Sequence, residues 1–167
     1  MDMDGEKKFQ ELIKKIEQMK KTGEIDLSTE EDLSIAVMNL ISLEEHFFFT
    51  GAKTGKEEYL DLLLEIREVR KSLLKKLIGK HEGETWCISK HLLGTTMRLI
   101  EVGTKLLGDG KKDEAGEVFA KAHEIYSLFW ALRLKLIDTA GIKEIAANEH
   151  PWTLKDILNK LVDCCDE

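Results

Sequence analysis

The sequence predicts an all-α fold, an antiparallel bundle of four main helices with additional N- and C-terminal helices. Apolar residues recur at spacings of three and four along most of the chain, and a single proline interrupts 167 residues. The composition, 43% hydrophobic and 34% charged, is that of a globular chain long enough to bury a core without a disulfide or a metal. We expect one domain over residues 1–167, with residues 1–5 disordered and the core bundle at about 28–138.

The first two helices are expected at about residues 6–21 and 28–49. The first carries only a narrow apolar stripe, which predicts an arm on the surface. The second begins at Ser28, whose hydroxyl can accept a first-turn amide while Glu31 reaches back, an arrangement known as a capping box. Its apolar stripe consists of Leu33, Val37, Leu40, Ile41 and Phe48.

Residues 50–53 form a short connection, and Thr54 with Glu57 repeats the capping box at the start of a third helix that extends to about Ile78. This helix is acidic at its beginning and basic at its end, which complements the helix dipole. Because a short loop joins it to the second helix, the two are expected to be antiparallel neighbours.

Glycines between residues 79 and 83 separate the third helix from a fourth, at about 84–107. Gly108-Asp109-Gly110 then turns the chain into a fifth helix at about 112–138. An irregular stretch follows, and Thr153 caps a last helix that extends through residue 162.

The bulk charge excludes some partners. With 25 basic and 32 acidic residues, a net charge of −7 and a pI near 5.4, the chain lacks the clustered Lys and Arg that nucleic acid and anionic lipid require. It also lacks an N-terminal apolar leader and the roughly 18 apolar residues of a membrane span. We therefore expect a cytoplasmic protein, and we expect Cys87, Cys164 and Cys165 to be free thiols in a reducing compartment.

Residues 96–129 carry small and large side chains at the spacing of one tetratricopeptide repeat, and this segment resembles such a repeat. Gly103, Gly110, Ala115, Phe119 and Ala122 match its glycine, turn and helix-B positions. The segment departs from the pattern at Leu99, Val102 and Ser127, and no second copy occurs. Because such solenoids need about three repeats, the resemblance implies one tightly packed helical hairpin rather than a repeat array.

Two ionisable residues lie on stripes that are otherwise apolar. Glu44 shares its line with Leu40 and Phe48, and Arg70 lies between Ile66 and Leu73. An unpaired buried charge is costly, so Glu44 and Arg70 are expected to pair, either as an ion pair that fixes the register of two helices or as part of a ligand site.

Further polar residues occur on the fourth and fifth helices. Cys87, His91 and Arg98 belong to a polar column, and His123 is flanked by aromatic and aliphatic residues. A histidine in such a setting is typical either of a hydrogen-bonded core residue or of a ligand. The candidate polar interior site therefore consists of Glu44, Arg70, His91, Arg98 and His123.

A metal centre is the chemical alternative. Neither CxxC nor HExxH occurs, and no Glu is followed three residues later by His, which excludes the di-iron pattern of four-helix bundles. What remains is a single divalent metal ion held by some of Glu44, Glu45, Cys87, His91 and His123. Otherwise no cofactor is expected, and the sequence singles out no catalytic residue.

The leading functional prediction is a small scaffold or protein-interaction module that captures a protein partner or self-associates. Phe47, Phe48 and Phe49 are consecutive and cannot all face one core, so at least one is expected to cover a neighbouring helix or a partner. The expected binding groove is lined by Phe47, Phe49 or Trp152. The alternative is a metal- or ligand-binding bundle, with or without enzymatic activity, that uses the polar interior site.

Overall fold

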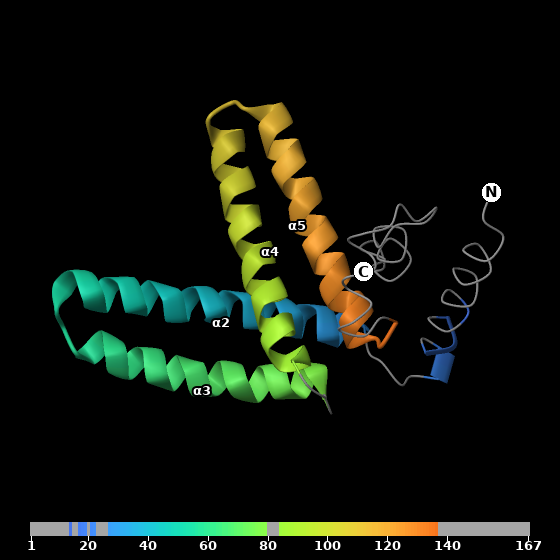
Figure 1. The fold of residues 1–167 in the computed structure, drawn as a ribbon, viewed down its shortest axis with the longest axis horizontal. Helices are drawn as coiled ribbons and strands as arrows, with labels where there is room; N and C mark the ends of the chain where they lie inside the picture. The colour runs from blue at the N-terminus through green and yellow to red at the C-terminus, as the bar shows by residue number, and fades with distance from the viewer. Residues whose placement is uncertain (1–13, 15–16, 20, 23–26, 80–83, 137–167) are drawn as a thin grey trace.

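The computed structural model describes residues 14, 17–19, 21–22, 27–79 and 84–136, and it confirms the all-α class (Figure 1). Four long helices make up most of this part, and it contains no strand. Most of the predicted first helix and all of the predicted last helix, together with Trp152, Cys164 and Cys165, lie outside the described residues. The four helices are α2 (Leu27–Thr54), α3 (Glu58–Ile78), α4 (Thr85–Gly108) and α5 (Lys112–Arg133).

The four helices form two antiparallel hairpins that cross. α2 packs along α3, α4 packs along α5, and the main contact between the hairpins is made by α2 and α4. Figure 1 shows the second hairpin lying crosswise to the first, so that each hairpin extends beyond the crossing as an arm. The predicted antiparallel neighbours within each hairpin are therefore present, whereas one bundle of four aligned helices is not confirmed.

The connection between α2 and α3 differs from the sequence prediction. α2 does not end at residue 49 but continues through Gly51, which is buried; a methyl group there would lie 3.4 Å from atoms of Tyr59 and Leu60, an ordinary van der Waals contact. The chain leaves the helix at Gly55, whose φ is +69°. Gly51 is therefore buried against α3 and does not break the helix.

Neither predicted capping box begins its helix. Thr54 lies at the end of α2, where its hydroxyl donates to the Thr50 carbonyl oxygen at 2.7 Å, and α3 is preceded by Glu57 with no side-chain cap. Ser28 lies within the first turn of α2, which begins one residue earlier at Leu27. The Ser-x-x-Glu and Thr-x-x-Glu patterns therefore lie near the beginnings of α2 and α3 but do not identify the first residue of either helix.

The tight packing predicted for the fourth and fifth helices is confirmed in the α4–α5 hairpin. A methyl group at Gly103 would lie 2.5 Å from Cε1 of Phe119, so only glycine lets this ring lie against the α4 backbone. Ala115 and Ala122 are buried on the facing side of α5. In the turn that follows α4, Gly110 has a φ of +76°, and the amide of Lys111 donates to the Leu106 carbonyl.

α5 ends at Arg133, five residues before the predicted end. Lys135 adopts a left-handed conformation with φ +54°, its amide donates to the Leu132 carbonyl, and the amide of Leu136 donates to the Ala131 carbonyl. These two bonds form the same helix-ending motif that Gly110 makes after α4. Lysine gives no sequence signal for such an ending, which explains the error.

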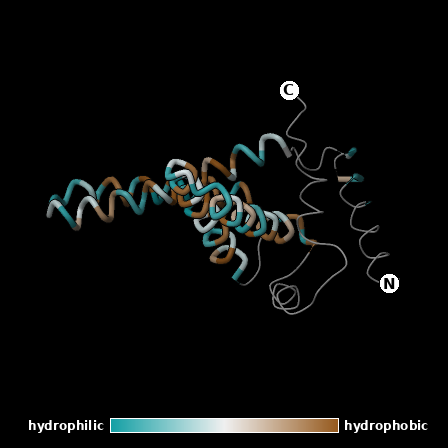
Figure 2. Tube along the Cα trace, turned by 90° about the horizontal axis from the view of Figure 1, so that it is seen from above, coloured by the Kyte–Doolittle hydropathy of each residue, from teal (hydrophilic) through white to brown (hydrophobic). Residues whose placement is uncertain are grey.

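The core lies where the hairpins cross. Leu74 and Leu77 of α3, Leu93 of α4, and Phe129 and Trp130 of α5 are almost fully buried and belong to one cluster. Figure 2 shows hydrophobic residues both at this crossing and along the α2–α3 arm that extends away from it. The crossing therefore stabilises the fold, while part of the arm's apolar surface is left outside the core.

Candidate functional site

The predicted pair of Glu44 and Arg70 is confirmed. The Arg70 Nε donates to Glu44 Oε1 at 2.7 Å and a terminal guanidinium nitrogen donates to Oε2 at 3.1 Å, a bidentate geometry. The Arg70 side chain is 3% exposed and that of Glu44 is 15% exposed. Because α3 presents this cation toward α2 in the middle of their contact, the pair fixes the register of the first hairpin.

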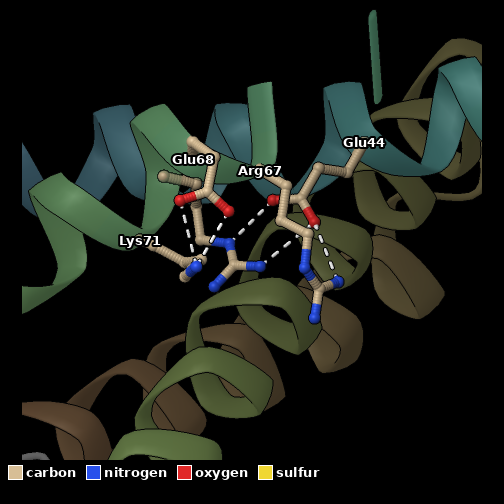
Figure 3. A network of polar contacts seen from close by, with 5 residues as sticks. Glu44, Arg67, Glu68 and Lys71 are labelled. Atoms are coloured by element: carbon tan, nitrogen blue, oxygen red, sulfur yellow. Dashed lines mark hydrogen bonds and ion pairs between the residues drawn. The ribbon is translucent and has the colours of Figure 1, made fainter. Parts of the chain in front are cut away.

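A looser network surrounds this pair on α3 (Figure 3). A terminal nitrogen of Arg67 lies 3.9 Å from Glu44 Oε2, and Lys71 donates to Glu68 at 2.8 Å. The hydrogen bond from Lys71 lowers the pKa of Glu68, desolvation raises it by a smaller amount, and the nearby charges of Lys71, Arg67 and Arg70 lower it further. Glu44 is thus the carboxylate that both Arg67 and Arg70 approach, whereas Glu68 is exposed to solvent.

The α2–α4 crossing accounts for a second charged pair. A methyl group at Gly94 would lie 3.3 Å from Cγ2 of Ile41, so the absence of a side chain lets the two helices approach closely. One turn further along each helix, Arg98 pairs with Glu45 at a half-exposed position. Arg98 is therefore not part of a polar interior. The polar column of α4 contacts α2 around this crossing, through Gly94 and Arg98.

The remaining candidate residues are not brought into one site. Cys87 and His91 are exposed, because α4 crosses α2 instead of lying along it, and His123 is half-buried on α5. Within the part of the chain that the structure describes, no three His, Cys, Asp or Glu residues are grouped so that they could hold a metal ion. The proposed ligands Glu44, Glu45, Cys87, His91 and His123 therefore do not form one cluster.

Two polar contacts between α2 and α5 were missed by sequence analysis. The Ser34 hydroxyl donates to the Glu31 carbonyl at 2.7 Å, so the Tyr126 hydroxyl, also 2.7 Å away, donates to Ser34. Near the ends of the two helices, Arg133 donates to Glu30 at 2.8 Å. The available signal was Ser34 itself, a small polar residue three positions before Val37 and four before Met38, which places it on their apolar face of α2.

The three consecutive phenylalanines separate as the sequence predicts. Phe47 is half-buried and its ring centre lies 6.4 Å from that of Tyr59 on α3, so it covers the neighbouring helix. Phe48 and Phe49 are 52% and 59% exposed. The predicted covering of a neighbouring helix is therefore made by Phe47, and two aromatic rings remain at the surface of the arm.

Phe48 belongs to a face of the first hairpin that α4 covers only in part. Ile41, Glu45, Phe48 and Ala52 follow one another at spacings of four, three and four, so they share one stripe of α2. α4 contacts this stripe at Ile41 and Glu45 and leaves the rest exposed.

The adjacent surface of α3 is also apolar and exposed. The Leu60 side chain lies beside Gly51, which is next to Ala52, and Leu64 follows one turn later. Leu60 and Leu64 are 48% and 59% exposed. We call the four exposed residues Phe48, Ala52, Leu60 and Leu64 the arm patch.

Comparisons with known proteins give no family for this chain. No protein-family model matches it, and neither the curated proteins nor the solved structures contain a significant match. Among the helices that the structure describes, none combines the length and the apolar character needed to cross a membrane.

Proposed function

We propose that this protein is a small helical scaffold whose work is to bind another protein chain, and that the arm patch is the binding surface. The single observation that carries the proposal is the exposure of Phe48, Leu60 and Leu64, three large apolar side chains on adjoining surfaces of α2 and α3. Phe49, Leu62 and Val69 are also exposed elsewhere on the same two helices. Clustered exposed apolar residues on a charged protein are typical of interaction sites.

The architecture supports this role. The core at the crossing of the hairpins holds the fold, so the α2–α3 arm is free to present a surface without being needed for that core. The bidentate pair of Glu44 and Arg70 keeps α2 and α3 in register beside the patch. A partner would therefore meet a preformed two-helix surface, which reduces the entropy lost on binding.

The partner expected for such a surface is an amphipathic helix. Phe48 and Leu64 provide apolar contact area, and the small Ala52 leaves room for a close backbone approach. The proposal requires no cofactor. It includes action in the cytoplasm, where the exposed thiol of Cys87 would remain reduced.

Site-specific photo-crosslinking tests the proposal. A photoreactive residue is introduced at Leu64 and, as a matched control on the exposed surface of the same helix, at Ser72. On irradiation in cells that produce the protein, we expect a defined crosslinked product from position 64 and none from position 72. Phe48→Asp should remove that product while circular dichroism remains unchanged. Equal labelling from both positions, or no product from position 64, would contradict the proposal.

A further inference from the structure

The face of α3 that carries the arm patch has a self-complementary pattern. Glu57, Leu60, Leu64 and Arg67 follow one another at spacings of three, four and three, so they form a single stripe. Glu57 immediately precedes α3 with helical dihedral angles, and its carbonyl accepts from the amide of Leu60 at 2.8 Å, which keeps it on the stripe. The stripe is thus acidic, apolar, apolar and basic in order.

From this pattern we infer that the partner of the arm patch is a second copy of this chain, docked antiparallel on α3 about a two-fold axis between Leu60 and Leu64. In that arrangement Leu60 of each copy faces Leu64 of the other. Glu57 and Arg67 are equally distant from the axis, so each Glu57 faces the other copy's Arg67. A two-fold interface requires this type of self-complementarity, in which every contact occurs twice.

Both charged groups are available for such contacts. Glu57 is exposed and has no ion-pair partner among the residues that the structure describes. The Arg67 side chain is 52% exposed, and its nearest carboxylate, Glu44, already accepts two hydrogen bonds from Arg70. Neither group would have to give up a close pair to meet a second copy.

The α2 side of the hairpin extends the same surface. Arg67 approaches Glu44 and Leu60 lies beside Gly51, which places the stripe along the α2 side of α3. Phe48 is therefore level with the apolar centre of the stripe and adds contact area at its flank. The inference rests on the proposed function and specifies its partner.

Charge reversal tests the inference on the full chain. The measurement is sedimentation equilibrium over a wide concentration series. The wild-type chain is expected to dimerise reversibly, and Glu57→Lys or Arg67→Glu should each weaken dimerisation by about tenfold or more, because two attractive contacts become repulsive. A mixture of the two variants should regain dimerisation, since every contact in the mixed dimer again joins opposite charges. The double variant E57K/R67E should regain it as well.

Glu65→Lys and Lys76→Glu are the matched controls, because both residues are exposed on α3 and lie off the stripe. They should leave the dimerisation constant unchanged. A monomeric wild-type chain at all concentrations overturns the inference, and so does a dimer that is insensitive to the reversals or is not restored in the mixture.

Failure of this inference differs from failure of the proposed function. A monomeric chain whose position 64 still crosslinks to a different protein retains the proposed function and excludes the second copy. A monomeric chain without any crosslinked product from position 64 excludes both.

Discussion

At the scale of single residues, Glu44 and Arg70 form a bidentate ion pair that is mostly buried between α2 and α3. Their spacing on apolar stripes predicts the pair, because a charge at such a position needs a partner. The contact between Ser34 and Tyr126 could not be predicted in the same way, because neither side chain carries a charge that needs a partner. His91 and Arg98 were expected in a polar interior but are exposed, because residue periodicity shows which face a side chain occupies but not whether another helix covers that face.

Loss of the Arg70 side chain should strongly destabilise the protein. Arg70→Ala leaves the mostly buried Glu44 carboxylate without its bidentate partner, and we expect the free energy of unfolding to fall by about 3 kcal/mol. Lys71→Ala is the control, because it removes an exposed pair with Glu68 on the same helix and should have little effect. Denaturant unfolding measures both, and equal effects would contradict the structural role of the inner pair.

A pH titration should separate Glu68 from other exposed carboxylates. Its pKa is lowered chiefly by the hydrogen bond from Lys71, so Lys71→Gln should raise it toward the ordinary value. Because the folded-state pKa is the lower one, the associated stabilisation is present above the unfolded-state pKa and is lost as the pH falls through the folded-state pKa. Carboxyl-carbon NMR measures the shift, and an unchanged pKa in the variant would exclude the Lys71 contact in solution.

At the scale of secondary-structure elements, glycine has three distinct roles that sequence alone does not separate. Gly110 turns the chain, Gly51 lies buried against α3 within the continuing helix α2, and Gly94 allows α4 to cross α2 closely. The sequence predicts the turn because Gly108-Asp109-Gly110 interrupts the apolar pattern. It treats Gly51 as a break, because close packing depends on a partner that is distant until the chain folds.

Two glycine substitutions should have opposite effects on stability. Gly103→Ala places a methyl group against the Phe119 ring, and the resulting overpacking should destabilise the protein by about 1–3 kcal/mol. Gly116→Ala on α5 meets no neighbouring atom within 4 Å, so higher helix propensity should stabilise the protein by up to roughly 1 kcal/mol. Thermal unfolding measures both changes. Stabilisation by Gly103→Ala would mean that the α4–α5 contact is looser than described.

At the scale of the whole molecule, the helices could be predicted but their arrangement could not. Helix existence and antiparallel hairpins follow from periodicity and short loops. The crossing of the hairpins depends on the pairing of Gly94 with Ile41 and on which side of α2 meets α4, and neither is encoded in the period of one helix. The arm patch follows from that crossing, which is why the sequence indicated exposed phenylalanines without placing the surface.

Native-state hydrogen exchange should show an uneven distribution of stability. Amides near Leu74, Leu93 and Phe129 lie in the buried cluster and should exchange most slowly, close to the rate of global unfolding. Amides around Leu60 and Leu64 have fewer buried neighbours and should exchange faster in dilute protein. Their protection should increase with protein concentration if a second copy covers them. Concentration-independent exchange there would argue against the second copy.

The crossing also has a mechanical consequence, because the part of the α2–α3 hairpin that extends beyond the crossing acts as a lever. Gly51 lies ten residues beyond Ile41 on the same helix, a distance of about 15 Å at 1.5 Å per residue. A rotation of about 10° at the contact between Ile41 and Gly94 would therefore displace the arm near Gly51 by roughly 3 Å. A larger side chain at position 94 could thus redirect the far end of the arm while leaving every contact within the α2–α3 hairpin intact.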